Sequence, residues 1–427
     1  MPAPSPEIQR AIDAVWRMEW PKLIGGLTHI TRDVGLAEDL AQDALVAALD
    51  QWPESGIPDK PGAWLMTAAR RRAIDANRRR SMADRKHEIL GAELDTRNEE
   101  SAAALFDTID DDIGDDELRL LFMACHPALS TEAQVALTLR LLGGLTTMEI
   151  ARAFLVPEPT IAQRIVRAKR TLVDQQVAFE VPRGTDRGER LGAVLDVIYL
   201  VFNEGYAATA GDDWIRPSLC EEALRLGRVL AGLAPDEPEV HGLVALMELH
   251  ASRLRARTGP GGEPILLLDQ DRSRWDRLLI GRGLASLARA QALGGTRGRY
   301  ALQAAIASCH AVALEASATD WARIVLLYDA LAQEVPSPVV MLNRAVAVGM
   351  AAGPGAGLDA VDAIAAEPAL KSYHLLPAVR GDLLVRLGRP AEARVEFELA
   401  ASLTRNARER LLLQHRAEAC GSNPGQA

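Results

Sequence analysis

Aromatic residues are scarce in this sequence, and its cysteines are few and scattered. Phe, Trp and Tyr make up only 4% of the 427 residues, whereas Ala and Leu are abundant. Because strands favour aromatic and β-branched side chains while helices favour Ala and Leu, this composition predicts an all-α protein. The four cysteines, at positions 125, 220, 309 and 420, form no C-x-x-C pair. We therefore expect neither a zinc site nor a disulfide framework.

Long apolar runs and the common catalytic motifs are also missing. No stretch of about 18 apolar residues is present to span a bilayer, and the N-terminus lacks the pattern of a signal peptide. We therefore expect a cytoplasmic protein without membrane contact. The sequence contains no P-loop, G-x-G-x-x-G, G-x-S-x-G or H-E-x-x-H motif. We accordingly predict no enzyme and assign no catalytic residue, metal ligand or cofactor.

Charge is distributed unevenly along an acidic chain whose formal net charge is −10. Residues 87–117 contain twelve acidic residues against Arg97 alone, a balance of −11. The rest of residues 1–175 contains 20 basic and 16 acidic residues, a balance of +4. Two modestly basic segments therefore flank an acidic one, and the overall acidity does not exclude binding to nucleic acid.

Helical periodicity and turn residues divide the chain into four parts. Residues 1–80 read as a compact helical domain, with a kink or break expected at Pro21. Residues 81–116 are acidic and poorly periodic, as is typical of a linker. Residues 117–176 form a second small helical domain. Residues 185–427 are helical almost throughout, and helix–turn–helix pairs such as 339–364 and 383–403 resemble the tetratricopeptide repeats of a solenoid.

The segment "PTIAQRIVRAKRTL" (159–172) predicts a two-sided helix. The apolar residues 161, 165, 168 and 172 share one stripe, onto which Ile150, Ala151 and Phe154 of a preceding helix would pack. Thr146 and Glu149 have the spacing of a capping box at the start of that helix. The opposite face carries Thr160, Gln163, Arg164, Arg167 and Arg170. This pattern favours a DNA-reading helix–turn–helix, with Lys169 left for phosphates, although an amphipathic helix with a solvated basic face has the same pattern.

A basic strip runs along the helix that we expect at residues 62–80. It consists of Arg70, Arg71, Arg72, Asn77, Arg78, Arg79 and Arg80. Spacings of seven and eight residues bring its two clusters to similar faces, which suits a phosphate backbone or a single strand. A solvated charge run is the alternative reading. We expect Trp64, Leu65, Ala68 and Ile74 of the same helix to belong to the core rather than to stack on bases.

These parts occur in the order of a known family. "AEDLAQDALVAAL" and "PGAWLMTAARRRAIDANRRR" resemble region 2, and "LTTMEIARAFLVPEPTIAQRIVRAKRTL" resembles region 4, of the extracytoplasmic-function sigma factors of the sigma-70 family. The resemblance covers residues 7–175, and the long helical extension is similar to one subgroup of the family. It implies two sigma-type helical domains joined by the acidic linker, and a factor that binds core RNA polymerase through its β′ and β subunits.

The resemblance also implies a role for each group of residues. Asp39, Gln42 and Asp43 would dock on the β′ coiled-coil, and the strip from Arg70 to Arg80 would hold the −10 element of promoter DNA. The face from Thr160 to Arg170 would read the −35 element in the major groove. Pro159 departs from the small residue that is usual in the family, so the reading helix is expected to start in a slightly different pose.

The extension carries two further charged or polar motifs. "LLLDQDRSRWD" (266–276) is either a catalytic cluster or a helix start with local ion pairs and a buried Trp275, and "YLVFNEGYAAT" (199–209) reads as a helix end. We expect the extension to regulate the sigma portion and to bind a regulatory protein. Two alternatives remain at this stage, namely a helix–turn–helix regulator that acts without polymerase and a helical-repeat scaffold or enzyme with an N-terminal adaptor.

Overall fold

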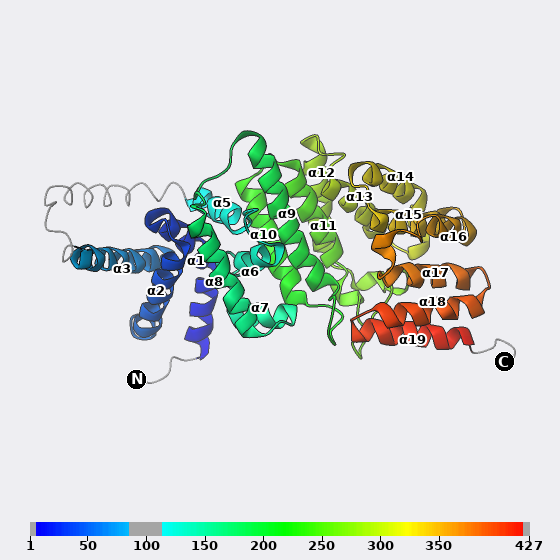
Figure 1. The fold of residues 1–427 in the computed structure, drawn as a ribbon, viewed down its shortest axis with the longest axis horizontal. Coiled ribbons are helices and arrows are strands. Elements are labelled where there is room, and N and C mark those ends of the chain that lie inside the picture. The colour runs from blue at the N-terminus through cyan, green and yellow to red at the C-terminus, as the bar shows by residue number, and fades with distance from the viewer. Residues whose placement is uncertain (1–5, 85–112, 422–427) are drawn as a thin grey trace. The chain divides into compact units, whose positions relative to one another are not determined.

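The computed structural model describes residues 6–84 and 113–421, and within these ranges it consists of helices without strands (Figure 1). This confirms the all-α prediction. The chain divides into two compact units, Met1–Val197 and Ile198–Ala427. The predicted acidic linker falls mainly on residues 85–112, which lie outside the described residues.

The first unit packs short helices around a small apolar core. Trp20, Leu23 and Leu27 of α1 are at most 2% exposed and contribute to this core. Helix α1 packs against α2, α3 and α5, and α8 packs against α6 and α7. The elements are α1 (Pro6–Thr31), α2 (Val34–Ser55), α3 (Pro61–Asp84), α5 (Ile113–Ala124), α6 (Thr131–Leu141), α7 (Thr147–Phe154), α8 (Glu158–Asp174) and α9 (Gly184–Tyr206).

Helix boundaries in this unit differ from the predicted ones at three places. Helix α1 continues through Pro21, because apolar side chains on both sides of it are buried and offset the roughly 3 kcal/mol that an internal proline costs. Helix α3 continues to Asp84, four residues past the predicted end of the domain. Helix α5 begins at Ile113, inside the predicted linker, and Asp115 and Asp116 stand near its N-terminus, where the helix dipole favours anions.

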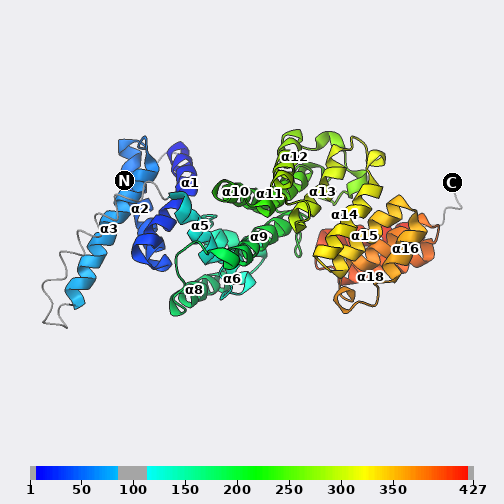
Figure 2. The same cartoon turned by 90° about the horizontal axis from the view of Figure 1, so that it is seen from above.

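The second unit is a succession of helices, each of which packs mainly on its neighbours in sequence. Contacts join α13 to α14, α14 to α15, and so on through α19, and α11 packs on both α12 and α13 (Figure 2). Such packing is what stacked helix pairs produce. The helices are α10 (Pro217–Leu233), α11 (Pro238–Ala251), α12 (Arg277–Ala292), α13 (Arg299–Val312), α14 (Trp321–Glu334), α15 (Pro338–Ala351), α16 (Pro354–Asp362), α17 (Leu375–Arg386), α18 (Pro390–Leu403) and α19 (Ala407–Gly421). Short 3-10 turns lie between them at η2 (Leu254–Ala256), η3 (Leu267–Asp269), η4 (Arg272–Arg274), η5 (Ala316–Ala318) and η6 (Pro368–Leu370).

Both helix pairs predicted from turn residues in the extension are present. Residues 339–364 correspond to α15 and α16, and residues 383–403 correspond to the end of α17 and to α18. Glycines allow the close approach in the first pair, because a Cβ on Gly357 would lie 2.7 Å from the Cα of Gly349. In the second, Gly388 closes the turn with a φ of 71°, a conformation that side chains disfavour.

Membrane-spanning helices and clusters of metal ligands are both absent from the described residues. Within 6–84 and 113–421, no helix has both the length and the apolar character that a bilayer span needs. The same residues contain no group of three His, Cys, Asp or Glu side chains that could hold a metal ion. All four cysteines are free thiols, and Cys125, Cys220 and Cys309 are buried.

Packing of α17 on α18 gives a stability prediction. A Cβ at Gly381 would lie 2.6 Å from the ring of Phe397, which is 1% exposed in the core of the second unit. We expect Gly381→Ala to lower the free energy of unfolding by about 1–3 kcal/mol, because the ring has no room to withdraw. Thermal denaturation followed by circular dichroism measures this change.

The matched control is Gly281→Ala on α12, where nothing lies within 4 Å of the added Cβ. That substitution should stabilise the protein by about 0.5–1 kcal/mol through helix propensity alone. Equal melting temperatures for the two variants would contradict the packing argument.

Candidate nucleic-acid interface

Helices α7 and α8 form the predicted helix–turn–helix. The Thr146 side chain accepts a hydrogen bond from the Glu149 amide, and the Glu149 carboxylate accepts one from the Thr146 amide, which completes the capping box. The turn contains Leu155 in the left-handed conformation, with a φ of 52°. Pro159 lies in the first turn of α8, where its missing N–H leaves no hydrogen bond unmade.

Helix α8 is divided between a buried and an exposed side, as its periodicity predicted. The buried residues of α8 are Ile161, Ile165, Ala168 and Leu172, and Ile150 and Ala151 of α7 are buried as well. We call the other side the recognition face, which comprises Thr160, Gln163, Arg164, Arg167 and Arg170. Four of its members are exposed, and Arg164 is half-buried. At the far end of the face, Arg170 makes a long ion pair of 3.5 Å with Asp174, in which both side chains remain mostly exposed.

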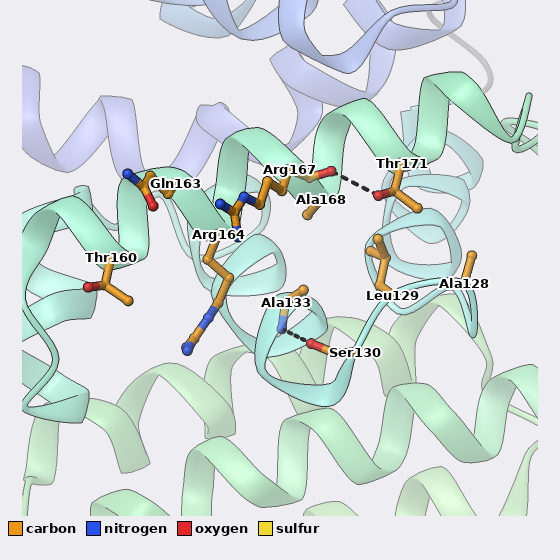
Figure 3. A pocket seen from close by; sticks show the side chains of 10 residues that line it. All are labelled: Ala128, Leu129, Ser130, Ala133, Thr160, Gln163, Arg164, Arg167, Ala168 and Thr171. Carbon is orange, nitrogen blue, oxygen red and sulfur yellow. Dashed lines mark hydrogen bonds between the residues drawn. The ribbon is translucent and has the colours of Figure 1, made fainter.

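The recognition face borders a groove of about 360 Å³ between α8 and the start of α6. Figure 3 shows Arg164 extending from α8 toward the first turn of α6, where the Ser130 hydroxyl accepts a hydrogen bond from the Ala133 amide. The pKa of Glu132 in that turn is lowered, first by a backbone hydrogen bond, then by Ser130 and to a smaller degree by Arg164. The lining residues are Ala128, Leu129, Ser130, Ala133, Thr160, Gln163, Arg164, Arg167, Ala168 and Thr171.

A second predicted site, on α2, is an exposed polar face. Asp33 caps this helix by accepting hydrogen bonds from the amides of Gly35 and Leu36. Asp39, Gln42 and Asp43 are all exposed, at spacings that put them on one side of the helix. We call these three residues the docking face. Gln42 also donates a hydrogen bond of 3.2 Å to Glu38 one turn earlier.

The basic strip on α3 is only partly exposed. Arg71 is exposed, whereas Arg70 and Arg72 are half-buried, and Arg72 donates a hydrogen bond to the backbone carbonyl of Asp43 on α2. The polypeptide of α3 continues through residues 77–80. The side chains of Asn77, Arg78, Arg79 and Arg80, and of Ile74, lie outside the described residues, so their predicted role stays a prediction.

Trp64 takes a different position from the core position that was predicted. Leu65 is 1% exposed, as expected, but Trp64 and Ala68 are half-buried and line a groove of about 480 Å³ between α2 and α3. The Trp64 ring packs edge-on against the buried Trp52, with the centroids 5.3 Å apart. This contact fixes the ring while leaving part of it accessible from the groove, beside Thr67 and Arg71.

Sequence reasoning missed the interaction that joins α2 to the helix–turn–helix domain. Glu38 is only 4% exposed. Its carboxylate accepts a hydrogen bond of 2.6 Å from Arg140 Nε on α6 and forms an ion pair with Lys169 Nζ on α8. We call this contact the Glu38 bridge. Lys169 was expected to meet DNA phosphates, but here it is half-buried and points to α2, because position 169 lies next to the buried stripe. Glu38 and Lys169 are 131 positions apart in the sequence, so no local pattern could indicate the pair.

Neighbouring contacts support the bridge. The Trp20 indole N–H donates a hydrogen bond of 3.0 Å to the carbonyl of Arg140. Asp116, at 1% exposure, lies 2.9 Å from His29 of α1 and 2.6 Å from Arg119. This carboxylate belongs to the acidic run that was predicted to be linker, yet it is buried between α1 and α5.

Comparisons with known proteins bear on these surfaces. The family model for sigma-70 region 2 matches residues 16–82, and that for sigma-70 region 4 matches residues 119–172. A family of unknown function matches residues 190–291. The docking face and basic strip thus fall in the first match and the recognition face in the second, while the second unit begins inside the third.

Relatives of the whole chain and of its first part are known. An uncharacterized protein of Rhizobium meliloti (strain 1021) is 44% identical over 402 residues, which cover 93% of this chain and 94% of the relative. The probable ECF RNA polymerase sigma factor SigI of Mycobacterium tuberculosis is 26% identical over 170 residues, 40% of this chain and 57% of that protein. The ECF RNA polymerase sigma factor SigK of Mycobacterium sp. (strain KMS) is 27% identical over 159 residues, 36% of this chain and 77% of that protein. No solved structure matches the chain.

Removal of Glu38 should be costly. We expect Glu38→Ala to reduce the free energy of unfolding of the first unit by about 2–4 kcal/mol, because it leaves two half-buried cations without their counter-charge. Urea denaturation followed by tryptophan fluorescence measures the loss. Asp39→Ala removes a carboxylate from the next, exposed position and should change stability by less than about 0.5 kcal/mol. A Glu38 variant as stable as the Asp39 variant would mean that the bridge contributes nothing.

Proposed function

The chain belongs to the extracytoplasmic-function group of the sigma-70 family, and we propose that it brings core RNA polymerase to promoters with −35 and −10 elements. The observation that carries this proposal is the recognition face of α8, an exposed Gln and Arg surface in a helix–turn–helix that coincides with the region 4 match. The role is one of binding rather than catalysis. Its partners are core polymerase and promoter DNA.

In this proposal α8 enters the major groove of the −35 element. Arg side chains form bidentate hydrogen bonds with guanine, and Gln does so with adenine, so Gln163, Arg164 and Arg167 suit base reading. Arg170, at the end of the face, suits a phosphate. The groove between α8 and the first turn of α6 leaves Arg164 room to change rotamer as it meets the DNA.

The groove between α2 and α3 supports a role at the −10 element. Promoter opening unstacks bases at a cost of a few kcal/mol per step, and an aromatic surface offsets about 1–3 kcal/mol for each base that it stacks. Trp64 offers such a surface beside Arg71 and Arg72. We propose that this groove receives a base of the displaced strand, with the arginines of the strip along its backbone.

The docking face suits the β′ subunit of polymerase. Asp39, Gln42 and Asp43 form an exposed polar surface with two negative charges, which steers association with a basic partner. Glu38, one position before this face, is already neutralised by Arg140 and Lys169, so it adds no charge to the face.

Binding to a promoter requires the Glu38 bridge to break. Elements at −35 and −10 are about 25 base pairs apart, which is about 85 Å at 3.4 Å per base pair. Helix α8 is joined through Lys169 to Glu38 of α2, on which α3 packs, so α8 and α3 cannot contact the two elements together in this arrangement. We propose that the bridge belongs to a closed state that polymerase and DNA open.

We further propose that the second unit regulates the sigma portion through a protein partner. Stacked helix pairs build extended surfaces that suit protein binding. On α18, Val395 and Leu399 lie one turn apart and are 64% and 50% exposed, so their apolar side chains are available to pack against a partner.

The recognition face can be tested by substitution. Arg167→Ala should lower the affinity of the polymerase holoenzyme for its promoter by about 5- to 150-fold, which corresponds to 1–3 kcal/mol, and should relax the preference for one −35 base. Run-off transcription from wild-type and −35-substituted templates measures both effects. Arg183→Ala removes an exposed arginine between α8 and α9 and should leave both unchanged. Failure of the wild-type protein to bind core polymerase and direct run-off transcription would refute the proposed function.

Regulation is tested by removing the helices after α9. A protein that ends at Tyr206 keeps α9 whole, including Arg190, which donates a hydrogen bond to the carbonyl of Phe122 on α5. We expect its promoter-specific output to differ from that of the full chain by severalfold in cells. Equal output in cells and with purified polymerase would exclude a regulatory role for the second unit.

A further inference from the structure

Two segments that stood out in the sequence of the second unit meet at one buried arginine. Arg253, just after α11, lies against Tyr206 from the first segment and Trp275 from the second, with its guanidinium carbon 5.8 and 5.7 Å from the two ring centroids. Arg257 stacks on Tyr206 at 3.7 Å, and Arg272 packs on Trp275 at 4.8 Å. We call Arg253, Arg257 and Arg272 the arginine cluster.

The aspartates near the cluster accept hydrogen bonds from backbone amides at helix starts. Asp271 accepts a hydrogen bond from the Ser273 amide, and Asp276 caps α12. Trp275 is 2% exposed, which confirms the predicted buried tryptophan at a helix start. Neither aspartate forms an ion pair with the cluster among the residues that the structure describes. The carboxylates of Asp271 and Asp276 are therefore occupied by the backbone.

Two members of the arginine cluster are buried, and the third, Arg257, is half-buried. Arg253 and Arg272 are 9% and 6% exposed, and within residues 198–421 no carboxylate pairs with any member of the cluster. Glu248 of α11 is buried but pairs with Arg228, at 2.8 Å. Burial lowers the pKa of Arg253, and the charge of Arg257 lowers it further. Burying a cation costs more free energy than a cation–π contact returns, so the aromatic rings alone leave Arg253 and Arg272 under-compensated.

Unpaired hydrogen-bond donors gather at the same place. Arg272 is fixed by hydrogen bonds of 2.7 Å to the carbonyls of His310 and Ala313. Burial and the arginines lower the pKa of His310 to about 3, so this ring is neutral and adds no positive charge. The following buried atoms have no partner among the described residues: Arg257 Nε, Arg272 Nε, Trp275 Nε1, Tyr206 Oη and Trp214 Nε1. Each of these five atoms can donate a hydrogen bond, which suits an oxyanion. Gln270 Oε1, which is an acceptor, and His310 Nδ1 are also buried without a partner among the described residues.

An open pocket beside the cluster shares Trp275 with it. It has a volume of about 560 Å³ and is lined by Trp275, Ser273, Asp276 and two exposed arginines, Arg255 and Arg274. Trp275 is the shared wall, because its ring also lies against Arg253 and Arg272.

We propose that the arginine cluster, with Tyr206 and Trp275, is a binding site for a small molecule that carries an oxyanion, a phosphate or a carboxylate. The anion pairs with the guanidinium of Arg253 and accepts hydrogen bonds from the unpaired donors around it. This inference is independent of promoter recognition, since every residue of the site lies in the second unit.

Isothermal titration of the full chain tests the site with three probes, namely inorganic phosphate, glycerol 3-phosphate and acetate, each against chloride at equal ionic strength. We expect at least one probe to bind the wild-type protein, and the strongest probe identifies the head group. Arg253→Met should weaken that binding at least tenfold. Without a probe, it should melt at or above the wild-type temperature, because it replaces an uncompensated buried charge with an apolar chain.

Two further variants complete the test. Arg253→Lys keeps the positive charge but loses the planar, bidentate guanidinium, so it should bind the probe between three- and tenfold more weakly than the wild type. This variant replaces Arg253→Met in the test if the Met variant does not fold. Arg282→Met removes an exposed arginine of α12 and should bind like the wild type. The proposal is overturned if no probe binds the wild type better than chloride, or if the Arg253 variants bind as tightly as Arg282→Met.

Discussion

The first unit depends on one buried carboxylate that is held by two cations from a distant part of the chain. Glu38 belongs to α2, the helix whose exposed side carries the docking face, and its partners Arg140 and Lys169 belong to α6 and α8. A single pair of oxygens thus connects the helix proposed to bind polymerase with the helix proposed to read DNA. A buried ion pair adds little net stability, but removing one partner is costly because the other charge is left buried without a counter-charge. The pair therefore fixes how the helices are arranged more than it stabilises the fold.

Local signals were sufficient to predict the helix–turn–helix. The capping box at Thr146 and Glu149 and the apolar stripe of α8 depend on residues only three or four positions apart, and both are present as predicted. The stacked helices of the extension were predicted in the same way, from Gly- and Pro-containing turns and from small residues where two helices approach. Gly349 of α15 and Gly357 of α16 lie against each other at such an approach. Family resemblance supplied the remaining roles, which periodicity alone does not contain.

Long-range contacts were beyond the reach of that reasoning. Lys169 looked like one more basic residue of a DNA-binding helix until the fold brought it to Glu38. Asp116 looked like part of an acidic linker, and the carboxylate is instead buried next to His29. The arginine cluster is a similar case, because Tyr206, Arg253 and Trp275 stand in three separate stretches of sequence. In each case an isolated charge has a local explanation that is wrong or incomplete, and only its three-dimensional partner reveals its role.

The division of α8 into sides has a consequence for how such proteins diverge. One side of α8 packs into the core, through Ile161, Ile165, Ala168 and Leu172. A second side carries Lys169, where a cation is needed to pair with Glu38. In the role proposed for α8, duplicated copies of the gene acquire new target sequences by changing only the outer side, chiefly positions 163 and 167. New specificity then evolves without loss of the fold, and the number of distinct promoter classes that one scaffold can serve is set by the few side chains that fit there.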